Sequence, residues 1–174
     1  MVPHTPYLLV GHNTQGIHLI NWESKSEEKS LFLGNVTVFD IKILGNWIWV
    51  ACSDGNLIQI DLEAFAVVKK TKCSEKPIRS IEVVPERGWL VVGCSDAHMA
   101  VLNMATLEMV QSWPANHPSV FSVLSIPETE ILYSGGRDAH LKSWSWQDFD
   151  LIQDVPAHLF AINQIVHLSS LHLL

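Results

Sequence analysis

The chain of 174 residues has a mass of 19.5 kDa, which is room for one domain or a short array of repeats and excludes two full catalytic domains. Hydrophobic residues make up 48% of the chain and charged residues 17%, so the composition supports a core and excludes a disordered chain. The net charge of −7 offers no electrostatic attraction to nucleic acid or an anionic membrane. The longest uncharged apolar runs, such as Trp47 to Cys52, are far shorter than the roughly 20 residues of a membrane helix.

The N-terminal region and the cysteines indicate a compartment. Residues 1–16 have no basic segment ahead of a long apolar block, so no secretory signal is expected. The three cysteines are an odd number without a Cys-x-x-Cys pair, which is typical of a reducing environment rather than a disulfide framework. We therefore expect a cytoplasmic protein.

Taken from the N-terminus, the chain repeats itself with a period of about 42 residues. Asp54, Asp96 and Asp138 stand in matching turn segments, and Thr14-Gln15-Gly16-Ile17 is a weaker first copy. Other columns keep the same register: large apolar Tyr7, Trp47, Trp89 and Ile131; small Gly11, Ala51, Gly93 and Gly135; and upstream Ile41, Ile81, Val123 and Ile165. One step is shorter than the others because Pro85-Glu86, matched by Pro127-Glu128, has no counterpart after Leu44.

Each unit predicts short strands, because apolar blocks of about five residues alternate with turn signals. The third unit is the clearest, and its four expected strands are Ile78 to Val84, Trp89 to Gly93, Met99 to Asn103 and Met109 to Trp113. The Asp-Gly-Asn and Asp-Ala-His segments suit tight hairpin turns, since Asp, Asn, Gly and His tolerate left-handed backbone conformations.

The fold class predicted is all-β: a β-propeller of four-stranded antiparallel blades, with about four blades present as a partial or open propeller. The continuous apolar stretch from Trp47 to Ala51 indicates burial on both faces, as for a sheet stacked between two others. The expected units are a partial blade over residues 1–34, blades over 35–74, 75–115 and 116–156, and the first strand of a further blade over 157–174.

Residues 134–145, Ser-Gly-Gly-Arg-Asp-Ala-His-Leu-Lys-Ser-Trp-Ser, resemble the end of a Trp-Asp (WD) repeat, with Trp144 in the Trp place and Ser145 in the Asp place. Ala157-His158, followed by Ile162 and Ile165, resembles the Gly-His opening of the next repeat. The other units carry degenerate signature pairs at Ile20-Asn21, Ile60-Asp61 and Leu102-Asn103. The resemblance covers nearly the whole chain and implies structural roles for Asp54, Asp96, Asp138, Trp144 and His158.

In WD repeats a His, a Ser or Thr, the turn Asp and the Trp form a structural hydrogen-bonded tetrad. Carried onto the fourth unit, the resemblance assigns Asp138 and Trp144 to this tetrad. His117 lies one residue beyond the place of the family's His, which Asn116 occupies.

The resemblance also raises a question of length, because propellers of this family usually have about seven blades. Ile162 to Leu168 could supply the strand missing before Tyr7 and close a four-bladed ring, but a fragment or an open arc is favoured. An open arc exposes an apolar blade face and an unpaired strand edge, so self-association through open blade edges is possible, including two copies that close one ring.

Catalytic and metal sites are not indicated. The three turn aspartates recur one per unit, which favours a structural role over acid–base work. His98 and His140 recur in the same turns where Asn56 stands, without the spacing of a zinc site. Cys52 and Cys94 occupy one strand-end column typical of small buried residues. Trp113 and Trp146 are not explained by the repeat, and either could be exposed as a partner anchor.

The function predicted is a non-catalytic scaffold that binds a protein or peptide on the propeller face. The resemblance places Phe39, Arg79, Phe121, Asn163 and Arg137 on that face, and Arg79, Phe121 and Arg137 are the preferred contact residues because Arg and aromatic side chains dominate binding energies. The alternative is a propeller enzyme or cofactor binder, quinoprotein-like or lactonase-like, that uses the central channel. No gathering of carboxylates and histidines favours it, and no cofactor or metal is expected.

Overall fold

The computed structural model describes residues 5–168 and contains four antiparallel sheets. The first blade has three strands: β1 (Tyr7–Gly11), β2 (Ile17–Asn21) and β3 (Ser26–Leu31). The second blade comprises β4 (Val38–Leu44), β5 (Trp47–Cys52), β6 (Asn56–Asp61) and β7 (Ala66–Lys72). The third comprises β8 (Ile78–Val84), β9 (Trp89–Cys94), β10 (His98–Asn103) and β11 (Met109–Pro114). The fourth comprises β12 (Val120–Ser125), β13 (Ile131–Gly136), β14 (His140–Ser145) and β15 (Leu151–Pro156).

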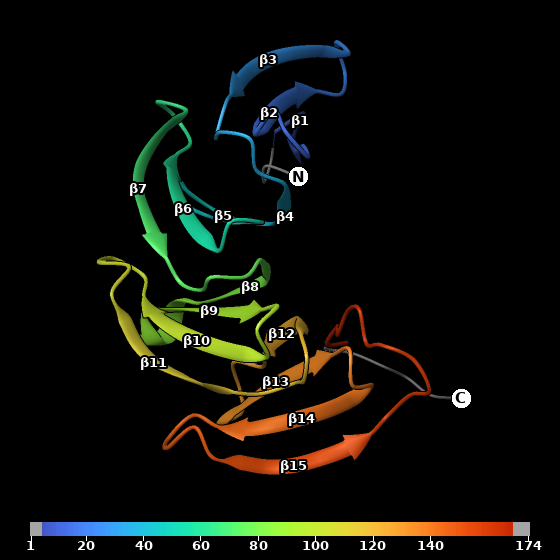
Figure 1. Cartoon of the computed structure of the whole chain (residues 1–174). Helices are drawn as coiled ribbons and strands as arrows, with labels where there is room; N and C mark the ends of the chain where they lie inside the picture. Colours follow the sequence, from blue (N-terminus) through green and yellow to red (C-terminus); the bar gives the residue numbers. More distant parts are fainter. Residues whose placement is uncertain (1–4, 169–174) are drawn as a thin grey trace.

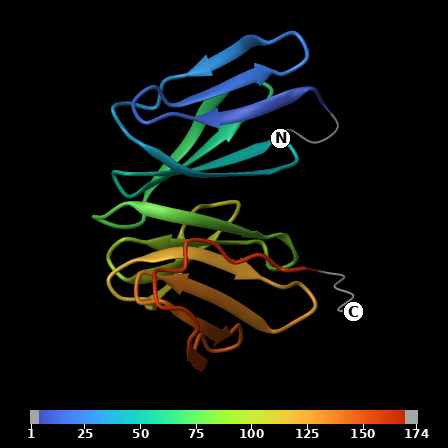
Figure 2. The same ribbon diagram turned by 90° about the vertical axis from the view of Figure 1, so that its right-hand side faces the viewer.

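The sheets follow one another in chain order as the blades of a β-propeller, which confirms the predicted fold class. Figure 1 shows them arranged along an arc, and Figure 2 shows the same blades stacked one on the next. Within each complete blade the strands pair in simple sequence order, and the first strand is innermost because β4, β8 and β12 pack against one another. Among the described residues the first blade lacks this inner strand, since β1 corresponds to β5, β9 and β13.

The strands of the third blade begin and end within one residue of the predicted positions. A turn of 3-10 helix, η1 (Pro85–Arg87), occupies the Pro-Glu insertion between β8 and β9 and ends at Gly88, whose φ is 66°. The insertion therefore changes only a turn and leaves the strand pairing of the blade intact.

The core consists of three apolar layers, each lying between two neighbouring blades. Strand β5 explains why its sequence is continuously apolar. Ile48 and Val50 face the first blade, whereas Trp49 and Ala51 face the third, and all four side chains are fully buried. Burial on both faces of this strand was predicted, but Trp47 at its start is 39% exposed and is not a core residue.

The column of small residues makes room for the inner strand of the next blade. A Cβ atom at Gly11 would lie 2.5 Å from Val38 Cγ1, and one at Gly93 would lie 2.7 Å from Val120 Cγ1. These separations are far below van der Waals contact, so a larger side chain in this column would push adjacent blades apart.

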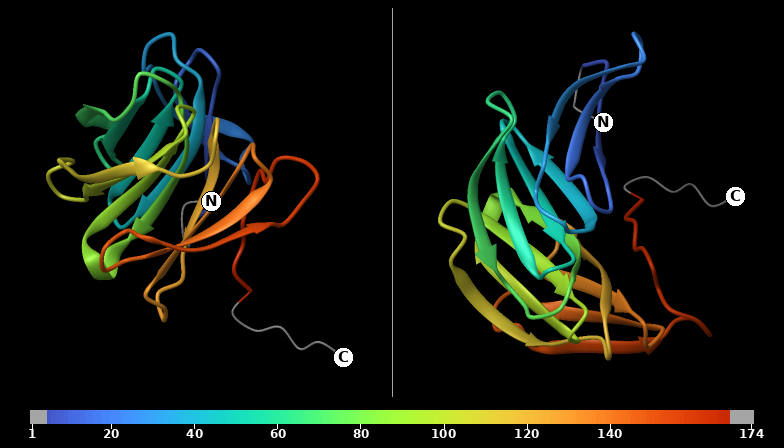
Figure 3. Two further views of the ribbon diagram at one scale, coloured as in Figure 1. Left: turned by 60° about the horizontal axis from the view of Figure 1, so that its bottom comes forward. Right: turned by 45° about the horizontal axis from the view of Figure 1, so that its top comes forward.

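Residues 157–168 contain no strand, where the first strand of a further blade was expected; residues 169–174 lie outside the described part. The segment nevertheless lies beside the fourth blade, as both views in Figure 3 show. A Cβ atom at Gly135 would lie 2.6 Å from Ile162 Cγ2, so Ile162 occupies the place that Val38 and Val120 take in earlier blades. The segment does not pair as a β-strand, because no neighbouring strand of its own unit lies beside it in the described chain.

Candidate functional site

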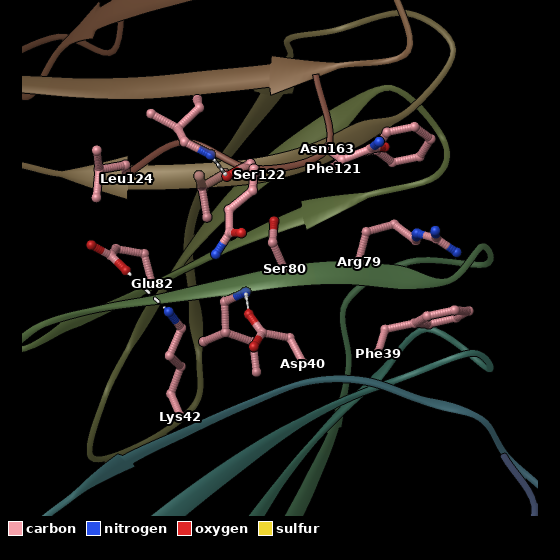
Figure 4. A pocket seen from close by; sticks show the side chains of 14 residues that line it. Phe39, Asp40, Lys42, Arg79, Ser80, Glu82, Phe121, Ser122, Leu124 and Asn163 are labelled. Carbon is pink, nitrogen blue, oxygen red and sulfur yellow. Dashed lines mark hydrogen bonds and ion pairs between the residues drawn. The ribbon is translucent and has the colours of Figure 1, made fainter. Parts of the chain in front are cut away.

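The inner strands bring Phe39, Arg79 and Phe121 side by side, and these are three of the residues that the WD-repeat resemblance places on one face. The guanidinium carbon of Arg79 lies 4.1 Å from the ring centroid of Phe39 and 5.1 Å from that of Phe121. Figure 4 shows the Arg79 side chain between the two rings. Stacking on aromatic faces favours a planar cation and holds it in one orientation. This group of three side chains, from β4, β8 and β12, is called the Phe-Arg-Phe ladder below.

Hydrogen bonds between blades keep the inner strands in register. The Ile81 amide donates to Asp40 Oδ2 at 2.8 Å. The Ile165 amide donates in the same manner to Ser122 Oγ at 2.9 Å, and the Ser125 amide donates to Glu82 Oε1 at 3.1 Å. The segment from 157 to 168 is thus attached to β12 as β8 is attached to β4.

A groove of about 320 Å³ runs along these inner strands below the ladder. Its lining residues are Phe39, Asp40, Lys42, Arg79, Ser80, Ile81, Glu82, Phe121, Ser122, Val123, Leu124, Asn163, Gln164 and Ile165. Exposed Asn163 belongs to the predicted face and lines this groove, although no strand carries it. Four lining residues of the groove were not predicted from the sequence: Asp40, Lys42, Glu82 and Ser122. Each lies one or three positions after Phe39, Arg79 or Phe121, and this spacing is the signal that identifies them.

The charged groups of the groove form contacts between neighbouring blades. Lys42 Nζ lies 3.6 Å from Glu82 Oε2. Burial raises the pKa of Glu82 above its ordinary value of 4.5, and the charge of Asp40 acts in the same direction, against the lowering effects of the Ser125 amide and of Lys42. Burial of Glu82 thus favours its protonated form.

A second cavity, of about 340 Å³, brings the three preferred contact residues together. Arg79, Phe121 and Arg137 line it, with Ser95, Pro118 and Ser119. Arg137 is exposed, and its amide donates to the Ser119 carbonyl at 3.0 Å, which ties the turn before Asp138 to the loop before β12. We call this cavity the two-arginine pocket.

The three turn aspartates have the same local geometry. The amide two residues on donates to Asp Oδ1 at 3.2 Å for Asp54, 3.1 Å for Asp96 and 3.2 Å for Asp138. The residue between them has a positive φ, of 76° at Gly55, 73° at Ala97 and 64° at Ala139. These bonds satisfy backbone amides at left-handed turns, which is a structural use of the carboxylate.

The fourth blade contains a network of four hydrogen-bonded side chains, in which Asn116 stands where the WD-repeat resemblance places a His. Asn116 Nδ2 donates to Asp138 Oδ1 at 3.0 Å. Ser134 Oγ donates to Asn116 Oδ1 at 2.6 Å, and Trp144 Nε1 donates to Ser134 Oγ at 2.9 Å. In the third blade only the first link remains, from Ser74 Oγ to Asp96 Oδ2 at 2.6 Å. The equivalent His158 is exposed and accepts from the Phe160 amide at 3.0 Å.

The two unexplained tryptophans pack inside the molecule. Trp146 is 2% exposed, and Trp113 lies partly buried, with ring centroids 6.0 Å from Trp144 and 5.0 Å from Phe149. Both belong to the aromatic packing between the third and fourth blades, so neither is an exposed anchor. Trp22 on the first blade is 51% exposed instead.

The three cysteine thiols lie in surroundings that disfavour the thiolate form. Burial raises the pKa of Cys52 and of Cys73 to about 12, and it raises the pKa of Cys94 further. All three are free. Within residues 5–168 no three His, Cys, Asp or Glu side chains gather as metal ligands, and no helix there is long and apolar enough to cross a membrane.

Comparison with known proteins supports the fold. A chain in a crystal structure of a mitotic checkpoint complex is 14% identical with a TM-score of 0.76, and the match covers 90% of this chain and 48% of that one. The computationally designed Ika8 protein is 14% identical with a TM-score of 0.79, over 94% of this chain and 50% of its own. The chain thus spans about half the length of each. No family model and no curated protein matches the sequence. The propeller fold is shown, and membership of the WD family stays a prediction from the repeat residues.

Proposed function

We propose that the protein is a non-catalytic interaction scaffold that binds a protein or peptide on the face formed by the Phe-Arg-Phe ladder and the two-arginine pocket. The observation that carries the proposal is the position of Arg79 between Phe39 and Phe121, all three of which line the groove. The likeness to a chain within a multiprotein complex agrees with a role in protein assembly.

Binding a partner costs free energy when flexible side chains become ordered. Arg and aromatic side chains contribute most to binding energies, and binding usually costs about 0.5–1.5 kcal/mol for each long side chain that is immobilised. Two rings already hold Arg79, so this cost is largely met before a partner arrives. Phe39 is still 37% exposed and has apolar surface left to bury.

The alternative, a propeller enzyme or cofactor binder, would need uncommitted acidic or basic groups in the groove. Asp40 already accepts the Ile81 amide, and Glu82 accepts the Ser125 amide and lies near Lys42. These groups hold blades together, which favours binding over catalysis. We also propose a cytoplasmic location, in agreement with three free cysteines.

The test is selection of binding peptides on the immobilised chain from a random peptide display library. Selected peptides should lose at least about tenfold in affinity for the Phe121→Ala/Arg137→Ala variant, because both contacts are removed. Its melting temperature should stay near that of the wild type. Arg79→Ala should give a similar loss in affinity.

The matched control is Val68→Ala/Lys69→Ala on the outer strand β7, which also removes one apolar side chain and one positive charge from exposed positions. This variant should bind as the wild type does. Equal losses in both double variants would contradict the assignment of the face, and a large fall in the melting temperature of Phe121→Ala/Arg137→Ala would mean that these residues are structural.

A further inference from the structure

The two-arginine pocket differs in charge from the rest of the molecule. The chain has a net charge of −7, yet the pocket is lined by Arg79 and Arg137 without an Asp or Glu among its lining residues in the described chain. Of the three arginines, Arg87 pairs with Glu130, whereas neither Arg79 nor Arg137 forms an ion pair with another described residue. The pocket therefore brings together two guanidinium groups that have no ion-pair partner in the described chain.

The pocket also offers polar groups of the right kind. Ser119 Oγ donates to Ser95 Oγ at 3.0 Å, so the two hydroxyl groups lie together in its wall. A hydroxyl group can both donate and accept, and Ser95 Oγ keeps its own proton to offer. The paired N–H donors of an arginine guanidinium and the O–H of a hydroxyl group are the donors that bind an anionic oxygen.

The guanidinium of Arg79 indicates which anionic group fits best. Its central carbon lies 4.1 Å from the ring centroid of Phe39 and 5.1 Å from that of Phe121, so the N–H donors are available only on the sides that the rings leave open. A guanidinium presents a planar fork of N–H donors, and a carboxylate accepts such a fork with two coplanar oxygens. Phe121 and Pro118 line the same pocket and would cover the carbon atoms of the side chain that carries the carboxylate.

We propose that the two-arginine pocket binds the carboxylate of an Asp or Glu side chain, and hence that the partner of this face is an acidic peptide segment. This inference rests on the proposed function, because it names the chemistry of the ligand that the same face takes. The net negative charge of the rest of the chain would repel an acidic peptide from other surfaces, so the pocket would also set where the peptide docks.

The experiment uses three synthetic peptide libraries that share random flanking positions and differ in one fixed central residue, which is Glu, Gln or phosphoserine. Each library is bound to the immobilised full chain at low salt and at about physiological salt. Glu peptides should be retained at least about tenfold better than Gln peptides, and added salt should reduce this preference.

Two variants localise the effect. Arg137→Gln should abolish the preference for Glu peptides over Gln peptides, while the flanking residues of the peptides still give weak retention. Arg137→Lys should keep part of the preference, because it keeps the positive charge but loses the fork of N–H donors. Circular dichroism melting of both variants confirms the fold. The exposed position of Arg137 makes a loss of folding unexpected.

The outcomes separate the two proposals. Equal retention of Glu and Gln peptides on the wild type, with binding still lost in Phe121→Ala/Arg137→Ala, would overturn the carboxylate pocket and leave the scaffold proposal standing. Preferential retention of phosphoserine peptides over Glu peptides would overturn the assignment to a carboxylate. Retention of none of the three libraries would contradict both proposals.

Discussion

Asn116 and Asp138 are joined across the fourth blade by a hydrogen bond of 3.0 Å from Asn116 Nδ2, and the same nitrogen also donates to the His140 carbonyl at 2.9 Å. Asn116 is fully buried and links the loop before β12 to the turn between β13 and β14. Through Ser134 the network continues to the indole of Trp144. A buried amide in the place of a histidine therefore completes the tetrad.

We predict that Asn116→Ala lowers the free energy of unfolding by about 2–4 kcal/mol, because Ser134 and the His140 carbonyl lose their partner inside the protein. Urea unfolding followed by tryptophan fluorescence measures it. Asn116→Ser is the matched variant, since Ser74 in the equivalent place still reaches its turn aspartate at 2.6 Å, and it should lose less. A change below about 0.5 kcal/mol for Asn116→Ala would contradict a stabilising network.

Thiol reactivity tests the burial of the cysteines. With a pKa of about 12, roughly one Cys52 thiol in ten thousand is ionised at pH 8, and thiolate is the reactive form. Iodoacetamide should therefore leave Cys52, Cys73 and Cys94 unlabelled in the folded chain and should label all three in urea, as read by mass spectrometry. Rapid labelling of the native protein would show that the blades open.

The raised pKa of Glu82 predicts a pH-dependent difference in stability. Folding favours the protonated carboxyl group, so the stabilising contribution is complete below the unfolded value near 4.5 and is lost as the pH rises through the higher folded value. Glu82→Gln keeps an acceptor for the Ser125 amide and does not titrate. Its melting temperature relative to wild type should therefore rise as the pH is increased from about 4 to about 7.

The control for this experiment is Glu128→Gln at an exposed position, whose melting temperature relative to wild type should change little over the same range. If the melting temperature of Glu82→Gln relative to wild type instead falls as the pH rises, the ion pair of Glu82 with Lys42 outweighs the effect of burial.

The inner edge of β1 predicts self-association, because no strand pairs with it within residues 5–168. Light scattering should give a mass that rises with concentration for the purified chain. Val10 on β1 is 44% exposed, and Val10→Lys should reduce the rise, whereas Val68→Lys on β7 should not. A single monomer mass at all concentrations would rule out association through this edge.

The blade architecture could be predicted from the sequence because it follows from local patterns. Matching turn aspartates set the period, short apolar blocks set the strands, and the all-apolar stretch of β5 required two neighbours. The WD-repeat resemblance selected the three residues of the ladder as members of one face. The stacking geometry of the ladder could not be predicted, because nothing in the spacing of Phe39, Arg79 and Phe121 fixes the rotamer of an arginine.

Other features depend on contacts between blades that no local pattern encodes. Asn116 was not recognised as a tetrad member because its chemistry differs from that of histidine, although its amide both donates and accepts. The burial of Trp113 and Trp146 could not be predicted, because it depends on the neighbouring blade and on Phe149. Residues 157–168 make the packing contacts of an inner strand but do not pair as a β-strand. Strand pairing requires a neighbouring strand, and a repeat pattern alone does not show whether one is present.

The most direct test of the binding face is an NMR spectrum of the arginine side chains with a bound peptide. The chain has three arginines, so three Nε–H signals report on the whole set, and Arg87 on the loop after β8 is an internal control. Titration with a selected acidic peptide should shift the signals of Arg79 and Arg137 and leave that of Arg87 unchanged. A peptide that binds while shifting only Arg87, or none of the three, would contradict the proposed face.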